Sequence, residues 1–227
     1  MGKSEKSLKK ICMLFIYDIK SLGIMFVVPI AIYIIIFIYL YFSYFKFNLN
    51  IDISVFKKAI GIIPIICVSF WIISLFGEFV DSQIKESLLS LPYNEFKFGV
   101  LKVIKISILY IVIYYIFTAI CLAYAKLDYT PDFFIMPMIQ ILFYSSFSFF
   151  SVLLARSMSG GYTIVGVFSC ISYMTRGGAN GYVYPFQWVN PKPGITLYTI
   201  NIALIVCSMI FLTMSYYIFK NREYLIK

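Results

Sequence analysis

Residues 77–105 read GEFVDSQIKESLLSLPYNEFKFGVLKVIK and form the only long charged segment that lies between two apolar runs of the chain. The segment holds four of the ten acidic residues and four of the nineteen basic ones. The apolar runs on both sides are long enough to avoid water, so we expect this segment to be the part of the chain that meets it.

The centre of this segment, 82–91, predicts a short amphipathic helix. Three apolar residues fall on one stripe at helical spacing: Ile84, Leu88 and Leu91. Lys85 and the other polar residues point elsewhere, and Pro92 ends the helix because proline cannot donate the next backbone hydrogen bond. Such a helix fits two interpretations, a docking element for a partner protein or a loop helix lying on lipid headgroups.

The composition identifies the class of protein. The 227 residues are 62% hydrophobic and 13% charged, whereas a soluble domain has roughly 25% charged and 45–50% apolar residues. Because a membrane span needs about 20 mostly apolar residues, the chain has room for six spans with short loops, and not for an additional soluble catalytic domain.

We therefore predict an all-α membrane protein with six transmembrane helices in a single permease-like domain over 1–227. An amphipathic helix over 1–22 is expected to lie on the membrane interface, where its lysines reach anionic headgroups; the alternative is a cytosolic extension of the first span. The spans are predicted at about 23–45, 59–77, 99–125, 133–154, 160–189 and 195–219.

The predicted fifth span is unusual. Its apolar run, 162–174, has only 13 residues, which is about 20 Å of helix against roughly 30 Å of hydrocarbon. The following stretch, 176–194, is rich in glycine, proline and aromatic residues. We expect a broken span that continues into a re-entrant, irregular segment covered by protein or by a watery cavity.

The distribution of basic residues predicts the orientation. With the amino terminus inside, 13 of the 19 lysines and arginines fall on the inner side. Because an excess of basic residues marks cytoplasmic loops, both termini and the 77–105 segment are expected in the cytoplasm of a plasma-membrane protein. The net charge of +9 is spread over span ends, which favours contact with the lipid bilayer and excludes nucleic acid as a partner.

Catalysis by this chain is not indicated. The chain has no histidine, and its five cysteines are scattered singly within apolar runs, so the commonest general base and metal-ligand spacings are missing. Gly2-Lys3-Ser4 lacks the loop, strand and helix of a nucleotide-binding motif. We expect no catalytic site, no metal and no cofactor in this chain.

Polar side chains recur at helical spacing inside two of the predicted spans. They are candidates to line a path for an amphipathic substrate: Tyr110, Tyr114, Thr118, Gln140, Tyr144 and Ser148. The favoured alternative is that they join helices, because hydroxyl groups bond helix backbones readily. Arg176, in the broken span, is a further candidate for the path, where it would stabilise an anionic headgroup or a substrate carboxylate; the alternative is that it anchors the outer interface.

The segment also resembles a known family. Glu78 closing the second span, the Leu-Leu-Ser-Leu-Pro run at 88–92 and Lys102 ten positions after the proline resemble the permease subunits of type 2 ABC exporters. The glycine-threonine pair that usually precedes the leucines is replaced here by 85–87, Lys-Glu-Ser.

The resemblance implies a helix that docks in an ATPase, and re-entrant helices after the fifth span. It also implies a second permease chain, identical or paralogous, and separate ATPase subunits that bind ATP and Mg. The docking residues would then be Glu78, Asp81, Ile84, Lys85, Leu88, Leu91, Pro92 and Lys102.

These observations predict an export permease without a catalytic site of its own. Its cargo would be an amphipathic peptide, a toxin or antimicrobial, or a lipid-like molecule, because the outer loops are short. The alternative is a membrane immunity or binding protein that sequesters a toxin without ATP.

Overall fold

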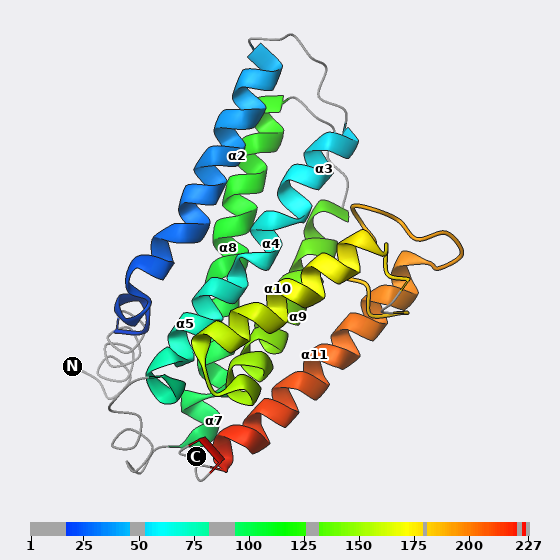
Figure 1. Cartoon of the computed structure of the whole chain (residues 1–227). Coiled ribbons are helices and arrows are strands. Elements are labelled where there is room, and N and C mark those ends of the chain that lie inside the picture. Colours follow the sequence, from blue (N-terminus) through cyan, green and yellow to red (C-terminus); the bar gives the residue numbers. More distant parts are fainter. Residues whose placement is uncertain are drawn as a thin grey trace, which may run out of the picture.

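The computed structural model describes residues 17–45, 53–81, 94–125, 132–178, 181–221 and 224–225 (Figure 1). Within these ranges the chain forms helices, turns and irregular segments, with no strand. The elements in chain order are a 3-10 helix η1 (Gly23–Phe26), α2 (Val27–Phe45), α3 (Ile53–Gly61), α4 (Ile63–Ile66), α5 (Val68–Val80), α7 (Glu95–Phe98), α8 (Val100–Ala125), α9 (Asp132–Ala155), α10 (Met158–Met174) and α11 (Leu197–Lys220).

Five stretches of the described chain are long and apolar enough to cross a membrane. They correspond to five of the six predicted spans and identify a membrane-embedded, all-helical protein. Their bounds are Gly23–Phe42, Ser54–Val80, Glu95–Tyr124, Phe133–Ala155 and Leu197–Lys220.

The helices run alternately up and down the bundle in Figure 1. We call the lower end in that view the basal end; it holds the start of η1, the end of α5, α7 and the turn between α9 and α10. The apical end holds the end of α2, the start of α3 and the irregular segment after α10. Helix α9 packs against α5, α8, α10 and α11, so it forms the centre of the bundle.

The second candidate span is broken into α3, α4 and α5. Pro64 follows the break, at which Ile62 has φ −110° and ψ −82°. Proline lacks the N–H that would bond the carbonyl of Ile60, and its ring crowds the preceding turn. The helical region begins at Ile53, earlier than the predicted start at 59, because α3 is an amphipathic helix that carries Lys57 and Lys58 in its second half.

The core is rich in aromatic side chains. Trp71 and Phe76 of α5 and Phe143 and Phe149 of α9 are fully buried, and the Phe76 and Phe149 rings lie 4.3 Å apart. The Trp71 ring stacks on Phe26 with centroids 4.8 Å apart and donates Nε1–H to the Phe26 carbonyl at 3.3 Å. This contact holds the base of the first span against α5.

The predicted fifth span is not one continuous helix. Helix α10 has 17 residues, about 26 Å at 1.5 Å per residue, and is followed by turns up to the start of α11. The expectation of re-entrant helices there is wrong for the described residues 175–178 and 181–196, which form turns and extended backbone. Glycine at 177, 178, 181 and 194 and proline at 185, 191 and 193 oppose a helix in this stretch.

Two predicted helices can be compared with the structure only at their edges. Of the amphipathic helix over 1–22, residues 17–21 are described and are helical. The short helix predicted over 82–91 lies outside the described residues, and so do its five docking candidates, Ile84, Lys85, Leu88, Leu91 and Pro92. The helix therefore stays a prediction.

Candidate functional site

The basal end carries the predicted docking residues that the structure describes. Glu78 and Asp81 lie at the end of α5, and Lys102 lies in the first turn of α8. Helices α5 and α8 flank the undescribed residues 82–93, and both meet the basal end (Figure 1). The chain thus leaves and re-enters the bundle at one end over this stretch.

Lys102 forms an ion pair with Asp18, a residue that the sequence interpretation did not include in the site. The Lys102 Nζ and Asp18 Oδ1 atoms are 3.1 Å apart, and the two side chains are 12% and 20% exposed. The pair joins the segment before η1 to the start of α8. The sequence gives little indication of this ion pair, because its two residues are 84 positions apart and form no local pattern.

Asp81 joins α5 to α10. Its Oδ2 accepts a hydrogen bond from the Met158 N–H at 3.3 Å, and the Ser157 Oγ accepts one from the Gly160 N–H at 3.1 Å. Two of the N–H groups left free at the start of α10 are therefore satisfied, one of them from another helix. A Cβ at Gly77 would lie 2.4 Å from the Met158 sulfur, so a larger residue there would require the Met158 side chain to move.

The turn between α9 and α10 is fixed from the other side by the C-terminal residues. Arg156 adopts φ +52°, and its guanidinium lies 3.7 Å from the centroid of the Tyr224 ring. The Tyr224 hydroxyl donates to the Leu154 carbonyl at 3.2 Å. The basal end is therefore a connected surface to which α5, α8, α9, α10 and the C-terminal residues all contribute.

The candidates of the third span contact the break in the second span. Tyr114 and Tyr110 are fully buried. The Tyr114 hydroxyl donates to the Ile60 carbonyl at 3.3 Å, the carbonyl whose helical donor Pro64 removes, and the Tyr110 hydroxyl donates to the Pro64 carbonyl. Both tyrosines join helices in this chain.

The candidates of the fourth span are also buried between elements. Gln140 donates to the Pro185 carbonyl of the irregular segment, and the Tyr144 hydroxyl accepts from Ser169 of α10 at 3.2 Å. Thr118 and Ser148 are fully buried as well. Gln140 and Tyr144 therefore join elements of this chain, and a path role for the four residues stays a prediction.

Arg176 is not brought together with the other six path candidates. It is exposed, directly after α10, with φ +47°, whereas the other six are buried in the bundle. The structure thus does not assemble the predicted path as one continuous surface of this chain.

The irregular segment after α10 closes the apical end. Gln187 is 4% exposed; its Nε2 donates to the Lys192 and Ile195 carbonyls at 3.2 and 3.1 Å, and its Oε1 accepts from the Lys192 N–H at 2.9 Å. Trp188 packs edge-on against Phe133 at 5.3 Å. The Gln187 side chain thus bonds three backbone groups of the irregular segment without water.

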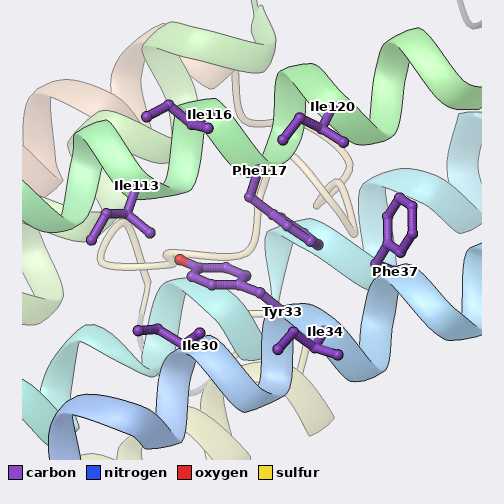
Figure 2. Close-up of a pocket in the computed structure, with 8 residues that line it drawn as sticks. All are labelled: Ile30, Tyr33, Ile34, Phe37, Ile113, Ile116, Phe117 and Ile120. Atoms are coloured by element: carbon purple, nitrogen blue, oxygen red, sulfur yellow. The ribbon is translucent and has the colours of Figure 1, made fainter.

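None of the predicted path residues lines any of three grooves on the described part of the bundle. One, of about 390 Å³, lies between α2 and α8 and is lined by isoleucine, phenylalanine and one tyrosine. Figure 2 shows the Tyr33 ring in the floor of this groove beside Phe117, with their centroids 4.6 Å apart. The second lies between α8, α9 and α11, and the third between α2, α3 and α10.

The serines of the second groove do not offer free hydroxyl groups. Ser107, Ser145 and Ser208 each donate to the carbonyl four residues earlier in their own helix, at 2.7–2.8 Å. A ligand in this groove would therefore meet an almost apolar wall.

The described residues contain no group of three or more cysteine, aspartate or glutamate side chains that could hold a metal ion. Comparison of the chain with protein-family models, with curated proteins and with solved structures found no match. The function must therefore be argued from the residues and their geometry.

Proposed function

We propose that the chain is the membrane-spanning permease subunit of an ATP-driven exporter of the type 2 ABC class, with ATP hydrolysed by separate subunits. The observation that carries this proposal is the position of the charged 77–105 segment. The two helices that flank residues 82–93 meet the same end of the bundle, so a hydrophilic segment with amphipathic spacing connects two spans at that end.

The contacts around the segment support a mechanical role for it. Asp81, directly before residue 82, is hydrogen-bonded to the start of α10, and Lys102, after residue 93, is paired with Asp18. A displacement of the segment would therefore move α5, α8 and α10 together with the residues that precede η1. In an exporter, the partner ATPase would supply this displacement, and a second permease chain would complete the path.

The orientation follows from the same proposal. The segment and both termini face the cytoplasm, and the irregular segment after α10 faces outside. The cargo is an amphipathic peptide, a toxin or antimicrobial, or a lipid-like molecule that enters from the bilayer, since the chain exposes apolar grooves between its helices.

The test is co-purification in mild detergent from cells that contain the native partners. We expect an ATPase subunit to accompany the wild-type chain in fixed stoichiometry and to be lost when Leu88 and Leu91 are both replaced by aspartate. Tyr182→Asp is the control, because Tyr182 is 60% exposed in the irregular segment. A chain that purifies alone and still protects cells from a toxin would contradict the proposal and favour an ATP-independent immunity protein.

A further inference from the structure

The groove between α2, α3 and α10 differs from the other two grooves because charge and hydroxyl groups lie at one of its ends. It has a volume of about 500 Å³. Its polar lining residues are Tyr39, Lys58 and Tyr173, and its apolar ones are Ile35, Ile36, Ala59, Ile62 and Ile63.

The polar and apolar residues are separated by depth. Tyr39 lies six residues before the end of α2, and Lys58 lies five residues after the start of α3, so both lie about 8–9 Å from the apical ends of their helices at 1.5 Å per residue. Ile63 lies about 15 Å from the start of α3 by the same rule. The groove is therefore polar near the apical surface and apolar below it.

Helix α10, the third helix of the groove, also places its polar residue near the apical end. Tyr173 is the last residue but one of α10, a helix that ends at the apical side, and Arg176 follows three positions later and is exposed. Tyrosine and lysine at the ends of apolar helices mark the depth of the lipid headgroups. The three polar residues of the groove thus lie where a phosphate would lie, above a channel for an acyl chain.

The electrostatic surroundings favour an anion. The described basic side chains at the apical end are Lys57, Lys58, Arg176 and Lys192; Asp132, whose side chain is not described, begins α9 at the same end, and the four carboxylates whose side chains are described belong to the basal segments. Lys57 lies over the rings of Phe133 and Trp188 at 5.5 and 5.7 Å, and Lys192 donates to the Gly177 carbonyl at 3.1 Å. Lys58, at the groove, pairs with no carboxylate of the described chain.

We propose that this groove binds one anionic phospholipid of the apical leaflet. Its phosphate lies on Lys58 beside the hydroxyl groups of Tyr39 and Tyr173, and an acyl chain lies along Ile36, Ile62 and Ile63. This site is independent of the proposed transport function, because it requires neither an ATPase nor a cargo.

The test uses the purified chain, delipidated in mild detergent and titrated with dioleoylphosphatidylglycerol or dioleoylphosphatidylcholine in native mass spectrometry. We expect one phosphatidylglycerol to stay bound per chain under conditions that remove phosphatidylcholine. Lys58→Gln is expected to weaken this binding about fivefold, the usual contribution of one lysine near a lipid surface, while Lys58→Arg preserves it. Lys97→Gln, at the basal end, is the control and should change nothing.

A second pair of variants tests the acyl channel. Ile63 is 55% exposed in the groove, and Ile108 is 54% exposed on α8 outside all three grooves. Ile63→Trp should abolish retention of the lipid, and Ile108→Trp should leave it intact. Equal retention of both lipids, retention unchanged in both Lys58→Gln and Ile63→Trp, or displacement of the lipid by millimolar inorganic phosphate would each overturn the proposal.

Discussion

At the scale of single residues, tyrosine hydroxyls of α8 act where proline disturbs the backbone of neighbouring helices. Pro64 removes the donor for the Ile60 carbonyl, and the Tyr114 hydroxyl donates to that carbonyl instead. Tyr115 donates to the Phe134 carbonyl, next to Phe133, the residue whose helical donor is removed by Pro137 inside α9. An unpaired carbonyl in a membrane interior is costly, so the Tyr114 hydroxyl stabilises a helix that proline alone would weaken.

This arrangement makes the Tyr114 hydroxyl testable. Tyr114→Phe removes the donor and keeps the ring, so we expect the free energy of unfolding to fall by about 1 kcal/mol, near the usual value for a hydrogen bond between membrane helices. The measurement is unfolding by SDS titration, followed by circular dichroism. Tyr198→Phe, at a residue that is 75% exposed, should show no change; equal curves for the two variants would mean that the bond contributes nothing.

Some of the contacts between single residues could be predicted from the sequence. Helical spacing placed Tyr110 and Tyr114 on one face of a span, and the structure brings them together at the proline break. The pairing of Asp18 with Lys102 was missed because it joins positions far apart in the chain. The spacing of residues within one helix does not predict which ends of two helices will be in contact.

At the scale of elements, the packing of the irregular segment on α3 depends on one residue without a side chain. A Cβ at Gly61 would lie 2.5 Å from Val189 Cγ2 and 2.9 Å from Trp188 Cζ3. Gly166, in the middle of α10, would place a Cβ in open space. The two glycines therefore form a matched pair in which only one allows a close approach.

We expect opposite results for alanine at these two positions. Gly61→Ala should lower the free energy of unfolding by about 1–3 kcal/mol, the usual cost of overpacking, and should change the fluorescence of the buried Trp188. Gly166→Ala should raise the free energy of unfolding by roughly 0.5 kcal/mol, because alanine loses less backbone entropy in a helix. SDS titration of both variants checks the signs; the packing argument is wrong if Gly61→Ala is the more stable of the two.

The elements themselves were largely predictable, because long apolar runs leave few alternatives to helices that span a membrane. The interruption after 174 was also predictable from its glycines and prolines. The interior of that segment was not, because the Gln187 side chain bonds backbone groups five and eight residues away, a local arrangement that follows no period.

At the scale of the whole molecule, the ion pair between Asp18 and Lys102 connects two segments of the basal end that lie far apart in the chain. Lys102→Glu should destabilise the protein by about 1–3 kcal/mol, between the values for exposed and buried pairs, since both side chains are only partly exposed.

The double variant Asp18→Lys with Lys102→Glu should restore most of the lost stability, because the opposite charges face each other again. A double-mutant cycle in SDS titration measures this coupling. Stability of the double variant equal to the sum of the two single effects would show that the pair does not hold the first residues of the described chain to α8.

The orientation of the chain in the membrane stays a prediction. The count of lysine and arginine by loop predicts both termini on the cytoplasmic side, and in the structure the first and last described residues belong to the same end of the bundle (Figure 1). The docking helix before Pro92 and the membrane that the chain occupies remain predictions, since they depend on contacts with other molecules.

Helix α10 has a consequence for the bilayer itself. It is about 26 Å long, and the exposed side chains of Val167, Ile171 and Met174 leave its outer face apolar as far as the apical end. A hydrocarbon layer of about 30 Å exceeds this length, so lipids beside this face must shorten or the helix must draw the surface inward. We therefore expect the membrane to be thinner beside this flank and lipids with shorter acyl chains to fit it best.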